Sequence, residues 1–310
     1  MLIRSILDAI GKTPLVELPQ WVPEGHARVF AKLESMNPGG SIKDRIGVAM
    51  VLAAEKEDLL KPGDTIIEAT AGNTGVALAM IAAVRGYQCV FVMPEKMSEA
   101  KSTILEAYGA KVVRTANAPP SSPDNFRNVA KRMAMENDWF LPEQFSHPAN
   151  PSVHRETTGP EIWEDMQHQV DAFVIGVGTG GTLTGAGGFL KEKHPEIKIV
   201  LADPKGSILG GGPDGSYAIE GIGGSDFPTN FDASLVDDVV YVTDEKAFEC
   251  SRELATQHGI LVGGAAGCCA VAARLWAQRQ EQEDLRIVTI FQDTGRNYQT
   301  LKTSPQLGAP

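Results

Sequence analysis

The sequence has few of the residues that mark secreted, metal-binding or membrane-spanning chains. Its 310 residues include only four cysteines and six histidines. The cysteines form no CxxC pair and the histidines no HExxH pair, so the pattern indicates neither a disulfide framework nor a metal site. No segment reaches the ~18 apolar residues that span a membrane, and the opening MLIRSILDAIGKTPL lacks the pattern of a signal peptide. We therefore expect a cytoplasmic protein that binds no metal.

Basic residues are also outnumbered. The chain has 28 lysines and arginines against 39 aspartates and glutamates, which gives a formal net charge of −11. The resulting field repels nucleic acids and anionic membranes at long range, and we expect neither as a partner. A local anion pocket built from backbone N–H groups is compatible with this charge.

Short β-rich runs alternate with helical patterns along most of the chain, and several of the runs are almost entirely apolar. This alternation predicts an α/β fold of βαβ units, with parallel strands covered on both faces. The length suits two domains or one large one. The predicted strands are 29–34, 65–70, 89–94, 111–115, 172–178, 198–204, 239–243 and 286–293, and the clearest helices are 76–86, 103–109 and 245–259.

Two loop segments interrupt this rhythm. Residues 142–154 (PEQFSHPANPSVH) contain three prolines and favour a crossing between domains. Residues 206–230 are long and glycine-rich without an obvious element, and loops of that length are usually functional or mobile.

A lysine follows the first glycine-rich turn, in NPGGSIKDR at 37–45. Ser41 has the character of a helix N-cap, and apolar residues follow it at helical spacing. Lys43 then lies in the first helical turn, where the helix dipole disfavours the protonated amine and so favours a nucleophile or base. The alternative is a solvated lysine beside Asp44.

A second turn, EATAGNTG at 68–75, joins a predicted strand to a helix that starts near Asn73 or Thr74. A strand, a glycine-rich turn and a helix N-terminus together present N–H groups to an anion, although glycine also serves in ordinary packing turns. Gln144, in the crossing loop, is a further candidate for this site; the alternative is an ordinary polar loop residue.

The third turn, GVGTGGTLTG at 176–185, again follows an apolar strand and opens a helix. Its N–H groups, two threonine hydroxyls and the helix dipole suit a phosphate group. The lysine of a Walker loop is absent. Gly176, Gly178 and Gly181 have GxGxxG spacing, but the acidic residue would have to be Asp203, so a dinucleotide site is the weaker alternative.

A lysine, a turn for a carboxylate and a turn for a phosphate together suggest pyridoxal 5′-phosphate (PLP) acting on an amino acid. Here the sequence resembles a known family, the fold-type II PLP enzymes related to the tryptophan synthase β-subunit, and within it cysteine synthase and cystathionine β-synthase. The motifs AKLESMNPGGSIKDR, EATAGNTG, MPEKMS, TTGPEIW and GVGTGGTLTG, spread over most of the chain, are similar in type, order and spacing.

The resemblance implies a role for each matching residue. Lys43 would bind PLP covalently and act as the catalytic base, and Asn73 would contact the ring oxygen of the cofactor. The phosphate would bind to Gly178, Thr179, Gly180, Gly181 and Thr182. The substrate carboxylate would bind to Thr70, Ala71, Gly72, Asn73 and Thr74, assisted by Gln144, with Gly221 of the EGIG segment at the mouth of the site.

The resemblance also implies two domains, each a mostly parallel sheet flanked by helices. Residues 1–40 and 146–310 would form the larger domain, which binds the phosphate, and residues 41–145 the smaller, mobile one. Members of the family are typically homodimers. The reaction expected is β-replacement on an activated serine, foremost O-acetyl-L-serine with sulfide giving L-cysteine and acetate. Joining serine or O-acetylserine to homocysteine is the alternative, because ADPKGSIL, IEGIG, VGGAAG and GRNY resemble cystathionine β-synthase more closely.

Two positions depart from the family pattern. Ala71 replaces the usual serine of the carboxylate turn. Ala265, followed by Ala266, stands where a serine usually contacts the pyridine nitrogen, which leaves a non-catalytic PLP-fold binding protein as an alternative of another class. Asp293 or Thr294, at the end of the last predicted strand, is a hypothetical substitute for that serine.

Overall fold

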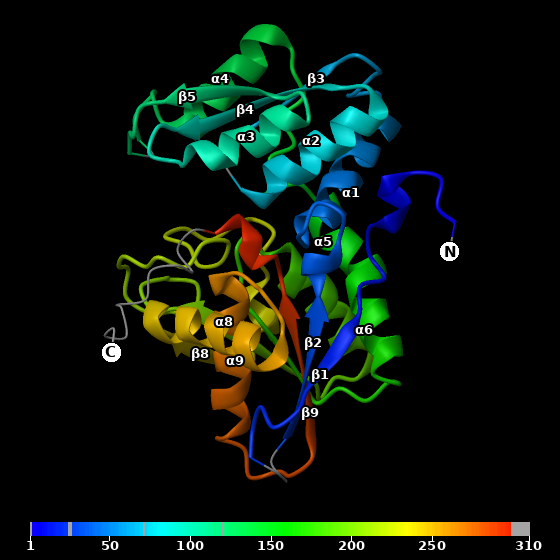
Figure 1. Cartoon of the computed structure of the whole chain (residues 1–310), viewed down its shortest axis with the longest axis vertical. Helices are drawn as coiled ribbons and strands as arrows, with labels where there is room; N and C mark the ends of the chain where they lie inside the picture. Colours follow the sequence, from blue (N-terminus) through cyan, green and yellow to red (C-terminus); the bar gives the residue numbers. More distant parts are fainter. Residues whose placement is uncertain (1, 24–26, 71, 120, 299–310) are drawn as a thin grey trace. The chain divides into compact units, whose positions relative to one another are not determined.

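The computed structural model describes residues 2–23, 27–70, 72–119 and 121–298, and the chain forms two compact units (Figure 1). The first unit takes the chain up to Ile10 and Asn37–Asn150; the second takes Gly11–Met36 and the chain from Pro151 onward. These divisions lie close to the boundaries expected after residues 40 and 145. The segment before Gly11 groups with the first unit, where Leu7 packs against the core. The roles of the two units stay a prediction.

The first unit is built on a parallel sheet with the strand order β3-β4-β5. Apolar residues of α1, α2 and α3 pack on one face, for example Leu78 against Phe91, and α4 covers the other face with Val129 and Ala130. Its elements are η1 (Ile6–Ala9), α1 (Lys43–Lys56), β3 (Thr65–Glu68), α2 (Asn73–Arg85), β4 (Gln88–Pro94), α3 (Glu99–Ala107), β5 (Lys111–Thr115) and α4 (Phe126–Asn137); α5 (Ala149–Val153) contains the division at Asn150.

The second unit is built on a six-stranded sheet with the order β1-β2-β9-β6-β7-β8, in which only the β1–β2 pair is antiparallel. Helices α8 and α9 pack on one face of it. Its elements are β1 (Leu15–Leu18), β2 (Ala27–Leu33), η2 (Glu34–Met36), η3 (His154–Thr158), α6 (Gly159–Asp165), β6 (Ala172–Ile175), η4 (Leu183–Gly187), α7 (Gly188–Lys193), β7 (Lys198–Pro204), η5 (Ala233–Leu235), β8 (Asp238–Val242), α8 (Asp244–His258), α9 (Gly264–Ala277), β9 (Leu285–Phe291) and η6 (Gly295–Asn297).

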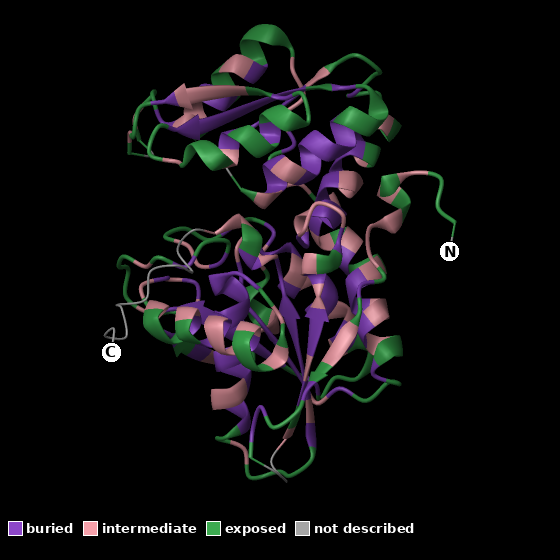
Figure 2. Ribbon diagram, in the orientation of Figure 1, coloured by how far each residue is buried: buried purple, intermediate pink, exposed green. Residues whose placement is uncertain are grey.

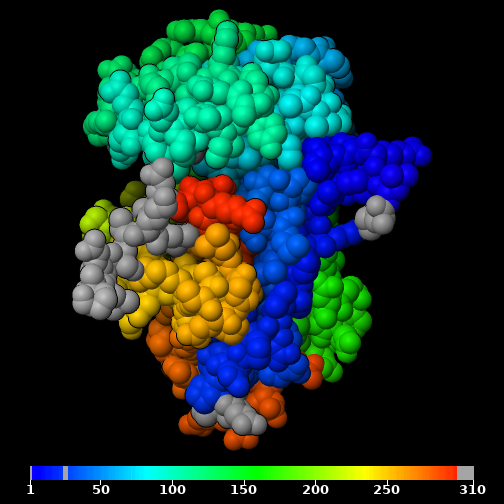
Figure 3. Space-filling model, viewed as in Figure 1, coloured from blue at the N-terminus to red at the C-terminus, as the bar shows by residue number. Residues whose placement is uncertain are grey.

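Burial follows the sheets. The central strands are buried along most of their length (Figure 2), as expected for parallel strands covered by helices on both faces. In contrast, the segment 2–10 lies on the surface (Figure 3), with the side chains of Leu2 and Ile6 exposed. Among the described residues, no helix has the length and apolar character needed to cross a bilayer.

The predicted α/β class and all the predicted strands are confirmed. The sequence patterns missed β1, because a four-residue strand with an exposed glutamate in its middle is too short to show periodicity. The glycine-rich stretch expected over 206–230 contains neither helix nor strand.

Candidate functional site

The predicted site residues divide between the two units, so each set is described within its own unit. Lys43, Thr70, Gly72, Asn73, Thr74 and Gln144 belong to the first unit, and Gly178, Thr179, Gly180, Gly181, Thr182, Gly221 and Ala265 to the second. Ala71 lies outside the described residues.

Lys43 is the first residue of α1 and is half-buried. The prediction that Ser41 caps this helix was wrong in one detail, because the cap residue is Ile42, in helical conformation. Ser41 is nevertheless buried, and its hydroxyl accepts a hydrogen bond from the backbone N–H of Lys43 at 3.2 Å. The lysine therefore does lie at the positive end of a helix, where no intrahelical carbonyl is available to its N–H.

The β3–α2 turn has the form expected of an anion site. Helix α2 begins at Asn73 after an extended cap residue, Gly72, which provides no capping side chain. The N–H of Gly72 donates to the Thr70 hydroxyl at 3.1 Å, which folds the turn back on itself. The first N–H groups of α2 follow directly, and N–H groups at this end of a helix have no intrahelical acceptor. Because both the groups and the dipole favour negative charge, the turn suits a carboxylate.

Gln144 is brought to this turn by the fold. Its side chain is buried, and its Oε1 accepts a hydrogen bond from the Thr74 hydroxyl at 2.6 Å. Its carbonyl accepts a second bond from Asn150 Nδ2 at 2.8 Å. Gln144 is thus fixed against the turn, which agrees with a role near it.

The glycines of the 178–182 turn are required by close packing within the second unit. A Cβ atom on Gly178 would lie 2.2 Å from the carbonyl oxygen of Gly221. Gly180 has a φ of +88°, and a Cβ there would lie 2.6 Å from the backbone nitrogen of Phe231. The structure therefore brings Gly178 and Gly221 together, and the N–H of Gly223 donates to Val177 at 2.7 Å beside them.

The helix that follows this turn starts as a π-helical segment, η4, with Thr182 immediately before it. Thr182 Oγ1 lies 3.2 Å from Nε2 of His154, whose Nδ1 lies 2.9 Å from the hydroxyl of Thr158. His154 is buried, and the sequence pattern assigned it no role. The histidine orients one of the two hydroxyls predicted to hold a phosphate.

At the other predicted contact, Ala265 and Ala266 are buried in the first turn of α9. The Asp293 carboxylate lies close to this turn, because a Cβ on Gly263 would be 2.5 Å from its Oδ1, and it accepts a hydrogen bond from the Tyr298 hydroxyl. The Thr294 hydroxyl accepts the N–H of Arg296 at 3.3 Å. Both hypothetical substitutes therefore lie beside the chain that leads into α9, with Asp293 against Gly263 and Thr294 paired with Val262.

Sequence reasoning also missed buried polar groups that support the turns. Glu68 ends β3 directly before the β3–α2 turn, and burial raises the pKa of its carboxyl to about 7. Asp203 is the residue before the last in β7, where burial raises the pKa of its carboxyl and its Oδ2 accepts the N–H of Gly210 at 2.9 Å. Both occur at strand ends, which is the only signal in the sequence that could have identified them.

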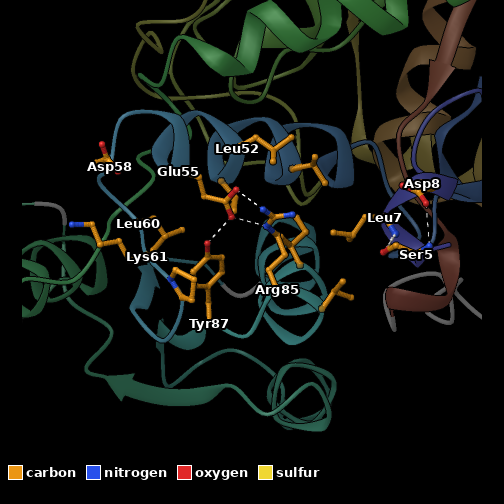
Figure 4. Close-up of a pocket in the computed structure, with 15 residues that line it drawn as sticks. Ser5, Leu7, Asp8, Leu52, Glu55, Asp58, Leu60, Lys61, Arg85 and Tyr87 are labelled. Atoms are coloured by element: carbon orange, nitrogen blue, oxygen red, sulfur yellow. Dashed lines mark hydrogen bonds and ion pairs between the residues drawn. The ribbon is translucent and has the colours of Figure 1, made fainter.

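The pocket in Figure 4 is a different feature. It has a volume of about 820 Å³ and lies in the first unit, lined by Leu52, Glu55, Arg85 and Tyr87 among others. Glu55 accepts hydrogen bonds from Arg85 and, at 2.5 Å, from the Tyr87 hydroxyl. None of the predicted site residues lines it, so its size alone does not make it the candidate site.

The residues present fit PLP. The 178–182 turn precedes a helical segment and contains Thr179 and Thr182, and backbone N–H groups and hydroxyls at the start of a helix suit a phosphate dianion. Lys43 supplies the amine that such a cofactor requires.

Comparison with known proteins agrees with this fit. Residues 6–293 match the family described as "Pyridoxal-phosphate dependent enzyme". Cystathionine beta-synthase of Apis mellifera is 44% identical over 310 residues, which cover 96% of this chain and 61% of that protein. Cysteine synthase of Staphylococcus aureus (strain N315) is 41% identical over 298 residues, covering 96% of this chain and 95% of that protein.

The solved structure of an O-ureido-L-serine synthase superimposes with a TM-score of 0.93 at 40% identity, covering 100% of this chain and 98% of that chain. The resemblance seen in the motifs thus extends over the whole fold, and PLP is the cofactor. The chain belongs to the family of pyridoxal-phosphate-dependent enzymes that includes cysteine synthase and cystathionine beta-synthase.

Proposed function

We propose that this enzyme is a cysteine synthase, which converts O-acetyl-L-serine and sulfide into L-cysteine and acetate. The observation that carries the proposal is the β3–α2 turn, whose helix N-terminus suits the carboxylate of a small amino acid. Similarity to a cysteine synthase over 95% of that protein's length supports the same reaction. A small nucleophile such as sulfide needs no further binding site.

When PLP is bound, its conjugated ring stabilises negative charge that develops at the substrate Cα. Lys43 would hold the cofactor covalently, and its amine, when free, would remove the Cα proton of the substrate. The Cβ–O bond then breaks and acetate leaves. The sulfur of sulfide forms the new bond at Cβ, and Lys43 returns the proton to Cα.

The other residues bind and orient. We propose that Thr70, Ala71, Gly72, Asn73 and Thr74 hold the substrate carboxylate, that Asn73 contacts the cofactor ring oxygen, and that Gly178, Thr179, Gly180, Gly181 and Thr182 hold the phosphate. Gln144 holds Thr74 in place, and Gly221 lines the approach to the phosphate turn. Closure of the carboxylate turn would exclude water from the reacting carbon.

A second candidate is the joining of serine or O-acetylserine to homocysteine. The 44% identity to a cystathionine beta-synthase favours it. This chain spans 61% of the length of that protein. The β-carbon chemistry is the same in both reactions, and only the leaving group and the thiol differ.

A substrate matrix distinguishes the candidates. The purified holoenzyme is assayed with serine, O-acetyl-L-serine and O-phospho-L-serine, each with sulfide and with homocysteine, and K43A serves as the control. If the enzyme is a cysteine synthase, kcat/KM is highest for the pair O-acetyl-L-serine and sulfide. A preference for homocysteine would establish the second candidate, and PLP binding without turnover of any pair would leave a binding protein.

We further propose a cytoplasmic homodimer, by analogy with the typical assembly of the family. Sedimentation equilibrium tests the assembly, because a dimer has twice the chain mass of 33.2 kDa.

A further inference from the structure

The β3–α2 turn is attached at both ends to one neighbouring segment of the first unit. At its start, Oε1 of Glu68 accepts the N–H of Ala69 at 2.9 Å, and the same carboxyl accepts the backbone N–H of Gln144. At its end, the Thr74 hydroxyl donates to the Gln144 side chain at 2.6 Å. Both ends of the turn, at Glu68 and at Thr74, are therefore hydrogen-bonded to the same residue, Gln144.

The Glu68 carboxyl occupies an unfavourable place. The residue is 5% exposed, and its Oε2 has no hydrogen-bond partner among the residues that the structure describes. A buried polar oxygen without a partner costs free energy, so a purely apolar side chain would be better for stability alone. The carboxyl does accept the N–H groups of Ala69 and Gln144, which an apolar side chain could not do.

We infer that Glu68 is a positioning residue for the substrate: its carboxyl fixes the start of the β3–α2 turn to the Gln144 segment and so holds the N–H groups of the turn ready for a carboxylate. The inference rests on the proposed function in one respect, since it takes this turn as the carboxylate site. It assigns Glu68 no contact with substrate or cofactor.

The charge of Glu68 gives this role a pH signature. The pKa of the carboxyl is raised to about 7, chiefly by burial and to a smaller extent by Glu143, while the two N–H bonds and Arg127 act in the opposite direction. A substrate carboxylate on the same turn is repelled by ionised Glu68 and not by the protonated form. Repulsion between two like charges in a partly buried site changes KM by roughly three- to thirtyfold.

The experiment compares three variants with the wild-type holoenzyme: E68A, which removes the carboxyl, E68Q, which keeps an acceptor oxygen but cannot ionise, and T115V as a matched control. Thr115 ends β5 in the same sheet, and its buried hydroxyl likewise has no partner among the described residues. Hydrogen exchange of the Gly72 and Gly75 amides, which are hydrogen-bonded in the turn, is measured, together with KM and kcat for O-acetyl-L-serine from pH 6 to 8.

We expect E68A to accelerate exchange of these amides about tenfold and to raise KM about tenfold while kcat changes less, because one or two hydrogen bonds of the turn are lost. E68Q should restore exchange and KM at pH 6, and the rise of KM with pH should be present in the wild type and absent in E68Q.

Equal exchange rates in E68A and T115V would overturn the inference. If E68A fails to fold, the E68Q comparison decides, and identical pH profiles of KM in E68Q and wild type would overturn it. Absence of turnover in the wild type contradicts the proposed function instead, and the exchange rates then still decide the role of Glu68.

Discussion

Two adjacent alanines lie in the first turn of α9, where the family pattern has a hydroxyl, and they offer the sharpest test at the scale of single residues. We predict that A265S tightens PLP binding by about two- to tenfold, because a neutral hydrogen bond is worth roughly 0.5–1.5 kcal/mol. PLP release measured by absorbance during dialysis checks this. A266S is the matched control, since Ala266 is equally buried in the same turn. Equal PLP affinity in both variants would contradict the assigned contact.

The four thiols give a second prediction at this scale. Burial raises the pKa of Cys89 and Cys250 to about 12 and that of Cys269 to about 11, and it also raises the pKa of Cys268. Raised thiol pKa values leave little thiolate, which is the reactive form. We expect no thiol to react with Ellman's reagent in the native protein at pH 8 and all four to react after denaturation. Rapid labelling of the native protein would show that the thiols are accessible.

At the scale of elements, the phosphate turn and the helix after it contain two glycines that differ in the space available for a Cβ atom. Gly180 has a positive φ and no room for a Cβ, whereas a Cβ on Gly187, within η4, would meet Ile199 at an ordinary 3.5 Å. We predict that G180A lowers the free energy of unfolding by about 1–3 kcal/mol and reduces PLP content. In G187A, the better helix propensity of alanine should leave stability unchanged or raise it by up to ~1 kcal/mol. Urea unfolding of both holo variants checks this, and equal losses would be inconsistent with it.

The sequence patterns predicted elements better than the contacts around them. The strand patterns from 65 to 293 and the three glycine-rich turns were visible because apolar runs and glycine carry local signals. Glu68 and Asp203 carry only their place near a strand end and His154 carries no such signal, since a lone acid or histidine becomes informative only when the fold buries it beside a backbone N–H or a hydroxyl. The cap of α1 lies one residue after the predicted position, because Ser41 accepts the N–H of Lys43 from just before the cap residue Ile42.

At the scale of the whole molecule, the buried Glu68 makes stability depend on pH. Its folded pKa of about 7 lies above the ordinary value for a glutamate, so between about pH 4.5 and 7 the native chain holds a proton that the unfolded chain has released. The wild type should therefore lose stability as pH rises through this range, by at most a few kcal/mol, whereas E68Q should lose less. Thermal unfolding of both proteins at pH 5, 6, 7 and 8 checks the prediction, and parallel curves would refute it.

The strand order of the second unit has a consequence for how the protein is made. Strand β2, near the start of the chain, lies between β1 and β9, the last strand, and pairs with β9 along its whole length. During synthesis β2 must therefore wait until β9 has left the ribosome, while Asn37–Asn150 are already available to form the core of the first unit. The apolar strand β2 is therefore covered late in synthesis. A chaperone that binds residues 27–33 would act while this strand is still exposed.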